Sequence, residues 1–507
     1  MGRLKEYMPA DSLAGAVADI EPTPSASSMG SVSNLTLDTT LLNRCIKTHS
    51  ACSNPSNSSL FPTRITDVIP NPPKPVPTSS LKLKKPNPYL TLSHHWDLQP
   101  IITTTITNFQ SRQEGIPMES LSKTFRDAVT ITRKMGVRYL WIDSICIIQD
   151  STSDWELEAA KMDDYYRHCL FTISAEDGSM GCFMRRDARL ERILAPRTLL
   201  FESDQISWTC LEMEASERYP EGKKTEGVLR NWGRGDEVLR HAFMGARLER
   251  GEWGSQDRER LLELYDRWYD LVKQYSSLEL KYESDIFPAL SSIAGLVHQA
   301  TGTGYVAGLW QSDLQRGLLW QVEEPGERLD LWRAPSWNWA SVTGGVTFHD
   351  FEDSNEDRSW DLDCVSIQGV DVAVPGKNPF GQVAEGMLQV NCCSKLRLAL
   401  KGDEVDETLR KDEDDDDNIL DTESGQLVGK FSPDNQDLLE GGIFCLPIIF
   451  EKGVFYTEDG AVPDEAWTTT CLALVPCGGI DVYKRVGLAR INGSKWIENE
   501  RTDLIII

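Results

Sequence analysis

The sequence predicts an α/β fold over residues 89–187, then a helical segment, then a β-rich carboxyl-terminal region. In the first stretch, short β-favouring runs alternate with segments of helical periodicity, and strands separated by helices indicate a parallel sheet with crossover connections. After residue 330, short β-favouring runs dominate. A chain of 507 residues is long enough for two or three packed units.

The α/β stretch opens with a compact β-favouring run at residues 89–92, bounded by prolines and a polar turn. We expect a helix from 119 to 135, followed by Gly136 in the position after its end. Its apolar residues recur at spacings of three and four: Leu121, Phe125, Ala128, Thr132 and Met135. Residues 138–142 and 170–175 have the composition of two further strands.

A second helix is expected between those two strands. Ser153 and Glu156 have the S-x-x-E form of a capping box, in which both side chains satisfy free amide groups at a helix start. We predict that this helix continues to about His168.

The rest of the chain divides by composition. Residues 1–40 are expected to be disordered, and 41–88 to form a lead-in with a Pro/Lys-rich linker from 71 onward. A helical middle region is predicted at 216–330, with helices at 258–275 and 286–301. The β-rich region at 331–507 contains an acidic loop at 401–418 with ten carboxylates.

Charge and composition exclude several classes of function. A net charge of −26 repels a phosphate backbone, so nucleic acid is not expected as a partner. No apolar run approaches the roughly 18 to 20 residues that cross a bilayer. The twelve cysteines are scattered and no apolar signal segment leads the chain, which indicates reduced thiols in a cytoplasmic protein.

One group of possible metal ligands stands out near the amino terminus. Cys45, His49 and Cys52 form the pattern C-x3-H-x2-C, which places them on one face of a helix. Three such ligands suit zinc, but a structural zinc site needs four and the neighbouring sequence offers no fourth. The sequence therefore predicts no metal site, and these three residues are the candidates should one exist.

Three blocks of the α/β stretch resemble the fungal heterokaryon incompatibility (HET) domain. They are residues 89–96, then 124–128 with 140–150, then a third block of Asp154, Trp155, Glu158, Met162 and Tyr166 with 172–175 and 181–183. Asp97 stands where the family usually has glycine. The Trp-x-x-Gln-Glu block that normally precedes a Leu-x-x-Arg segment is missing, since Arg189-Leu190 runs directly into 191–197.

The resemblance implies both a fold and a role. It implies a HET core at 89–187, with 215 as an alternative boundary, and a TIR-like parallel sheet with flanking helices. It also implies a self/non-self recognition effector of vegetative incompatibility and programmed cell death, working through protein partners and self-association. The missing block leaves open a degenerate or pathway-associated member without death activity.

The similarity to TIR domains, some of which cleave NAD, makes Glu158 the candidate catalytic residue of an NAD nucleosidase. Glu158 also lies beside an apolar helical stripe containing Trp155 and Met162, where a carboxylate is partly desolvated and suited to stabilise an oxocarbenium-like charge. The alternative is that Glu158 pairs with a polar group and holds the helix in place. No other cofactor is expected.

Three further residues are candidates for NAD or nucleotide contact. Ser93, Trp96 and Asp143 fall at the carboxyl ends of two predicted strands, where open α/β sheets bind ligands. Trp96 is suited to stack on a base and Asp143 to accept from a ribose hydroxyl. Alternatively, Trp96 belongs to the core and Asp143 caps the following turn.

Overall fold

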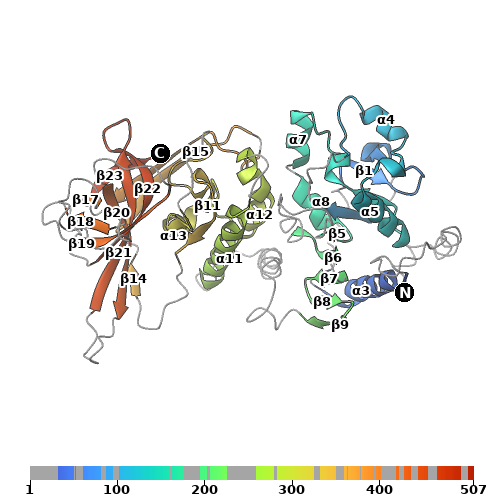
Figure 1. The fold of residues 1–507 in the computed structure, drawn as a ribbon, viewed down its shortest axis with the longest axis horizontal. Helices are drawn as coiled ribbons and strands as arrows, with labels where there is room; N and C mark the ends of the chain where they lie inside the picture. Colours follow the sequence, from blue (N-terminus) through green and yellow to red (C-terminus); the bar gives the residue numbers. More distant parts are fainter. Residues whose placement is uncertain are drawn as a thin grey trace. The chain divides into compact units, whose positions relative to one another are not determined.

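The computed structural model of this chain describes two compact units, one within Met1–Gly251 and the other formed by Glu252–Leu278 with Tyr282–Ile507. The residues described are 32–50, 52, 61–81, 87–94, 102–159, 161–175, 194–201, 206–224, 258–278, 283–324, 332–349, 359–361, 364–376, 378–392, 396–400, 418–421, 427–435, 443–454, 465–492 and 501–507. Each unit is built around its own sheet (Figure 1).

The first unit contains a nine-stranded mixed sheet in the order β2-β1-β4-β3-β5-β6-β7-β8-β9. The four strands β4, β3, β5 and β6 run parallel, and the remaining pairs are antiparallel. The sheet is therefore mixed, whereas the sequence predicted a parallel one. The strands are β1 (Arg64–Asp67), β2 (Lys74–Pro77), β3 (Tyr89–Ser93), β4 (Tyr139–Trp141), β5 (Thr172–Ala175), β6 (Arg197–Phe201), β7 (Ile206–Cys210), β8 (Met213–Ser216) and β9 (Tyr219–Lys224).

The parallel strands form the buried centre of this sheet. Every residue of β3 and β4 is buried, and the Leu140 and Trp141 side chains are fully enclosed. Thr91 and Thr172 lie opposite each other on neighbouring strands, and their hydroxyls hydrogen-bond at 2.7 Å. Buried hydroxyls need such partners, so this bond supports the register of β3 with β5. The strands predicted at 89–92, 138–142 and 170–175 are confirmed.

Helix α5 (Lys123–Lys134) covers one side of the parallel strands. It begins later than the predicted 119, because Pro117 leads into a short 3-10 turn at Met118–Ser120 and Ser122 is the true cap, its side chain accepting from the Phe125 amide. All five residues of the predicted apolar face are buried. Gly136 has φ 69°, the left-handed conformation expected after a helix end.

The opposite side carries α7 (Thr152–Ala159) and α8 (Met162–His168) (Figure 1). The sequence predicted one helix there, but the structure has two, and Lys161 is the residue that precedes α8. The predicted capping box at Ser153 is also wrong. Ser151 performs that function, because its hydroxyl accepts from the Asp154 amide, while Ser153 lies inside α7.

The sheet extends further in both directions than expected. Strand β2 lies in the supposed linker at 71–88, and its prolines are tolerated because, among the described strands, it lies at the edge of the sheet beside β1. Strands β8 and β9 carry the sheet to Lys224, beyond 215 and into the region predicted to be helical. Helix α3 (Val32–Thr48) occupies part of the amino-terminal segment that was expected to be disordered.

Other helices of the first unit are short. Helix α4 (Phe109–Glu114) follows β3 along the chain, and α6 (Asp143–Cys146) follows β4 directly. Residues 1–31 lie outside the described residues, as does the acidic segment at 401–417. Across the helices that the structure describes, none is long and apolar enough to span a membrane.

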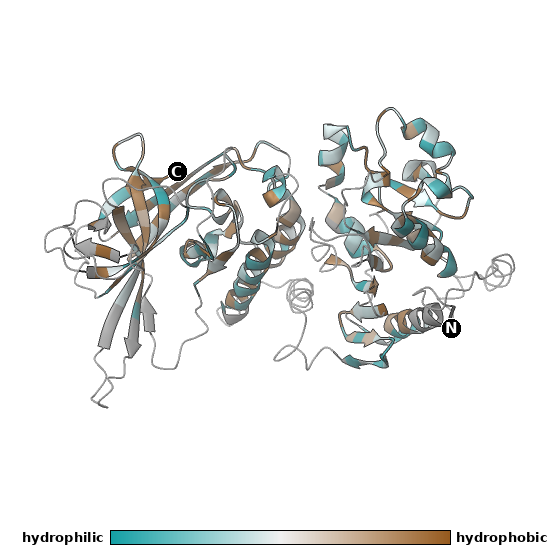
Figure 2. Ribbon diagram, viewed as in Figure 1, coloured by the Kyte–Doolittle hydropathy of each residue, from teal (hydrophilic) through white to brown (hydrophobic). Residues whose placement is uncertain are grey.

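The second unit begins with the two helices predicted from periodicity, α11 (Arg258–Ser276) and α12 (Ile286–Thr301). A layer of short elements follows. It contains β10 (Tyr305–Val306), β11 (Leu309–Trp310), α13 (Leu314–Gly317), β12 (Trp320–Val322) and β13 (Val346–Phe348). Figure 2 shows apolar residues along the sheets of both units and many polar residues on helices such as α5. The helices α11 and α12 share one compact unit with the β-rich region, rather than forming a separate domain.

A ten-stranded sheet makes up the β-rich region, as the sequence predicted. Six of its strands close into a ring, because β20 pairs with β17 and β21, and the chain of pairs continues through β18, β19 and β22 back to β21. The strands are β14 (Ser359–Asp361), β15 (Val365–Ala373), β16 (Glu385–Cys392), β17 (Leu396–Leu400), β18 (Asn418–Asp421), β19 (Leu427–Pro433), β20 (Ile443–Val454), β21 (Glu465–Pro476), β22 (Val482–Asn492) and β23 (Thr502–Ile506).

Apolar residues from all six strands of the ring form one core cluster. Alternate residues point to the same face of a strand, which explains pairs such as Ile443 with Cys445 and Ala489 with Ile491. The buried members are Leu398, Ile419, Phe431, Ile443, Cys445, Cys471, Ala473, Ala489 and Ile491. Closure of the ring thus encloses an apolar interior.

A buried arginine ties this sheet to the short elements before it. Arg485 on β22 is 2% exposed and donates to both carboxylate oxygens of Asp434, at 2.9 and 3.1 Å. It also donates to the Leu318 carbonyl at 2.6 Å and lies 3.4 Å from the centre of the Trp320 ring. Asp434 therefore neutralises a charge that has no access to water.

We expect Asp434→Asn to destabilise the second unit by about 3–5 kcal/mol, because it leaves the Arg485 charge buried without a counter-ion. Chemical denaturation of the full chain measures the change as a shift in the unfolding transition of the second unit. Asp371→Asn is the matched control, since Asp371 is exposed on β15. Equal stability of the two variants would contradict this role for the ion pair.

Candidate functional site

Two of the predicted site residues meet at one edge of the parallel strands. Ser93 is the last residue of β3, and Asp143 follows the end of β4 at the start of α6. Because β3 and β4 are parallel neighbours, both residues lie at the carboxyl edge of the sheet. Both side chains are buried. Asp143 accepts from the Ser144 amide at 2.6 Å, so its carboxylate also stabilises the start of the helix.

The structure adds His94 to this edge. Its Nδ1 atom lies 4.0 Å from an Asp143 carboxylate oxygen, and its ring packs edge-on against Phe125 of α5. A protonated His94 would form an ion pair with Asp143. The sequence alone does not pair His94 with Asp143, because their approach depends on the pairing of β3 with β4.

Two features noted in the sequence lie outside the described residues. Trp96, the candidate for base stacking, belongs to the segment 95–101. The place of the missing Trp-x-x-Gln block belongs largely to the segment 176–193.

Glu158 lies in the last turn of α7 and is fully buried. Its Oε2 atom accepts a hydrogen bond of 3.0 Å from the Tyr165 hydroxyl. Burial raises the pKa of Tyr165, so the hydroxyl keeps its proton and acts as the donor. The Oε1 atom of Glu158 has no hydrogen-bond partner among the described residues. One of the two carboxylate oxygens of Glu158 is therefore hydrogen-bonded within the fold.

Glu158 lies on the side of the sheet that α8 covers, because its partner Tyr165 packs on that face. The Tyr165 ring packs against Trp141 on β4, with ring centres 5.4 Å apart. Tyr166, also on α8, packs edge-on against the same indole at 5.6 Å. Ser93 and Trp141 belong to the same face, because β3 and β4 are in register at Thr91 and Trp141. Glu158 and Ser93 are thus on the same side of the sheet.

The Cys146 thiol is a poor nucleophile in this setting. It is fully buried, and burial raises its pKa to about 11. The thiolate is the reactive form, so a raised pKa disfavours attack at neutral pH. This agrees with a structural role for the thiol.

The amino-terminal ligand candidates gain a fourth member. Cys45, His49 and Cys52 lie with Cys210 in one cluster whose ligand atoms are all within 4.8 Å of one another. Hydrogen bonding to Cys210 raises the pKa of Cys45 to about 11 and raises that of Cys52 further, while the same bonds lower the pKa of Cys210. Three thiols and one imidazole therefore meet in one largely buried cluster.

Sequence spacing did not find Cys210, because it lies far along the chain from the other three. A usable signal was present. Residues 206–210 alternate, with Ile206, Trp208 and Cys210 all buried on one face of β7. This alternation would have placed the thiol on the covered side of a strand.

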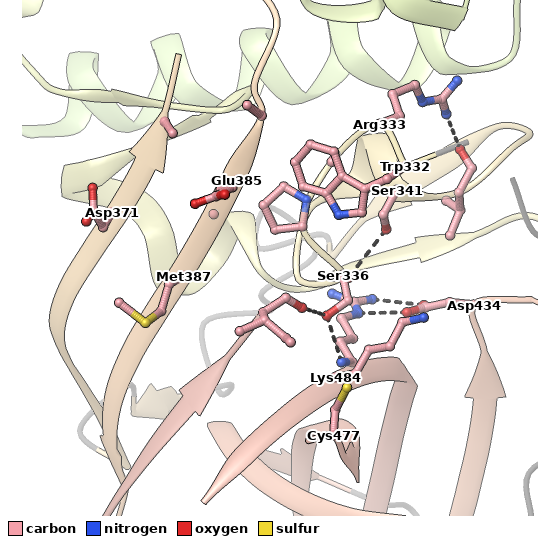
Figure 3. Close-up of a pocket in the computed structure, with 18 of the residues that line it drawn as sticks. Trp332, Arg333, Ser336, Ser341, Asp371, Glu385, Met387, Asp434, Cys477 and Lys484 are labelled. Carbon is pink, nitrogen blue, oxygen red and sulfur yellow. Dashed lines mark hydrogen bonds and ion pairs between the residues drawn. The ribbon is translucent and has the colours of Figure 1, made fainter. Parts of the chain in front are cut away.

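The second unit contains an open pocket of about 960 Å³. Asp371 and Glu385 line it on β15 and β16, while Lys484 and Cys477 lie on the other side (Figure 3). Asp434 and Arg485 also line the pocket, but they bind one another within the fold. The pocket shares no residue with the site at the edge of the first sheet.

One comparison with known proteins gave a match, and it lies within the first unit. Residues 89–225 match the family model of the Heterokaryon incompatibility protein (HET). This chain carries a HET domain. A comparison with curated proteins gave no match, and neither did one with solved structures.

The HET domain match coincides with sheet elements of the first unit. It begins at Tyr89, the first residue of β3, and ends one residue after β9. It includes Ser93, Asp143 and Glu158 and continues through the position where the Trp-x-x-Gln block is missing. Strands β1 and β2 and helix α3 belong to the same unit but precede the match.

We expect Tyr165→Phe to destabilise the HET domain by about 1–3 kcal/mol, because it removes the hydrogen-bond donor to a buried carboxylate. Denaturant unfolding of the full chain measures the loss. Tyr219→Phe is the control, because Tyr219 on β9 is 60% exposed and its replacement should change stability by less than about 0.5 kcal/mol. If Tyr165→Phe is as stable as the wild type, the Glu158 bond contributes little.

Proposed function

We propose that this protein is a cytoplasmic self/non-self recognition effector of fungal vegetative incompatibility, whose HET domain triggers programmed cell death after unlike hyphae fuse. The observation that carries the proposal is the HET family match over residues 89–225, which covers the sheet from β3 to β9. On this proposal the domain acts through protein partners and through self-association, as a TIR-like signalling module. The net charge of −26 favours protein partners over nucleic acid.

We expect self-association to appear in solution. Light scattering coupled to size-exclusion chromatography, performed over a range of concentrations, should show a mass above 57.0 kDa that increases with concentration. A constant monomer mass over that whole range would argue against assembly by this chain alone.

A second candidate function is hydrolysis of NAD by Glu158. In that reaction water adds to the ribose carbon and gives up one proton to the solvent, the bond to nicotinamide breaks, and nicotinamide leaves with the bonding electrons. A carboxylate stabilises the positive charge that develops on the ribose. The Oε1 atom of the buried Glu158 has no hydrogen-bond partner in the described part of the chain, which favours this candidate because buried polar atoms usually have a partner.

The position of the site supports the same candidate. Ser93 and Asp143 lie at the carboxyl edge of β3 and β4, the edge at which open α/β sheets bind ligands. Asp143 would accept from a ribose hydroxyl, and Glu158 lies on the same side of the sheet as Ser93. Trp96 remains the candidate for stacking on the base.

Glu158→Gln separates the two functions, because glutamine keeps the shape of the side chain but not its charge. If Glu158 is catalytic, NAD consumption should fall by about 100-fold or more, and cell killing should be lost with it. If the domain signals by association alone, killing should continue at constant NAD. NAD content and viability are measured together in cells that express each form at equal level.

Glu156→Gln is the matched control, since Glu156 is exposed on the same helix. It should behave as the wild type in both measurements. If the wild type neither kills cells nor consumes NAD when its partner is present, the chain is a HET protein without death activity, and both candidates fail.

A further inference from the structure

The cluster of Cys45, His49, Cys52 and Cys210 has the composition of a structural zinc site. Zinc in such sites has four protein ligands in a tetrahedron, and three cysteines with one histidine are a common set. Zn–S bonds of about 2.3 Å place tetrahedral ligand atoms about 3.7 Å apart. Here all four ligand atoms lie within 4.8 Å of one another, and the His49 Nδ1 atom is 3.3 Å from the Cys210 sulfur.

Two elements position these ligands. Cys45 lies in the last turn of α3, and the His49 amide donates to the Cys45 carbonyl at 3.0 Å, which continues the helical turn. This spacing of four residues puts both side chains on one face. Cys210 is the last residue of β7, where it pairs with Arg197 of β6. Cys45 therefore comes from a helix and Cys210 from a sheet far along the chain, while His49 and Cys52 follow the end of the helix.

Arg197 supplies the charge that such a site needs. Three thiolates and one neutral imidazole around Zn²⁺ carry a net charge of about −1. Arg197 is 2% exposed, and its Nε atom donates to the Cys45 sulfur at 3.1 Å. It also donates to the Cys52 carbonyl and to the Leu170 carbonyl. A buried cation held in this way offsets the negative charge and orients two of the ligands.

Burial indicates a closed site. The three cysteines are at most 1% exposed, and His49 is partly buried. With four protein ligands no position is left for water or substrate, as in structural rather than catalytic zinc sites.

We propose that Cys45, His49, Cys52 and Cys210 bind one Zn²⁺ ion, which fastens α3 to the sheet of the HET domain. Binding displaces the protons that the thiols still carry and forms three Zn–S bonds and one Zn–N bond. Three of the ligands precede the family match and the fourth lies inside it. The zinc therefore joins the amino-terminal helix to the HET domain as one folding unit, independently of whether that domain hydrolyses NAD.

Metal analysis of the full chain tests the proposal directly. Protein purified under reducing conditions and dialysed should contain one zinc per chain. After removal of zinc by a chelator, added Co²⁺ should give the visible absorption of a tetrahedral thiolate site, and Zn²⁺ should abolish it. Chelation should also lower the Tm and accelerate hydrogen exchange in α3.

Substitutions identify the ligands. Cys210→Ser and Cys52→Ser should each lose the bound zinc, whereas His49→Cys should retain it, because four thiolates also bind zinc. Cys169→Ser is the matched control, since Cys169 is a buried thiol of the same unit outside the cluster and its replacement should leave one zinc per chain.

Three results would overturn the proposal. The wild-type chain could bind neither Zn²⁺ nor Co²⁺ when reduced. Cys210→Ser could keep one tightly bound zinc. Mass spectrometry could also find a disulfide between two of these cysteines in protein purified with reductant and free of metal. The first and third results come from the wild type, so they do not depend on whether a variant folds.

Discussion

The four parallel strands β4, β3, β5 and β6 are buried on both faces. The need to cover both faces with other elements determines most of the architecture of the first unit. Helix α5 covers one face, and α8 covers the other with Tyr165 and Tyr166 packed on Trp141. The antiparallel strands at both ends extend the sheet beyond this centre. Because the central strands are parallel, their carboxyl ends come together, and this brings Ser93, His94 and Asp143 to one edge.

Elements with a strong local pattern could be predicted from the sequence. The face of α5 that contains Phe125 and the periodicity of α11 and α12 gave helices at the expected places. The boundaries of other elements depended on contacts that spacing does not show. Ser151 rather than Ser153 caps α7, because the chain after α6 presents that hydroxyl to the Asp154 amide. Strand β2 resembled a linker because proline is rare inside sheets, yet an edge strand tolerates it.

The site was partly predictable for the same reason. Ser93 and Asp143 follow recognisable strands, so their common edge could be deduced from the parallel order. The approach of His94 to Asp143 and the bond between Tyr165 and Glu158 require the packing of helices on the sheet. The spacing of ligands in the sequence could not predict Cys210, because it is the folding of the sheet that brings β7 to the end of α3. Neighbouring positions in the sequence reveal three of the four possible metal ligands, whereas the fold brings the fourth to them.

The distance along the chain between α3 and β7 has a consequence for synthesis. Cys45, His49 and Cys52 emerge from the ribosome well before Cys210 has been translated. During that interval the nascent chain exposes two soft thiols and an imidazole that are open to oxidation or to the wrong ion. Their protection therefore waits for completion of the sheet, and slow translation of residues 52–210 would lengthen the period in which these side chains are unprotected.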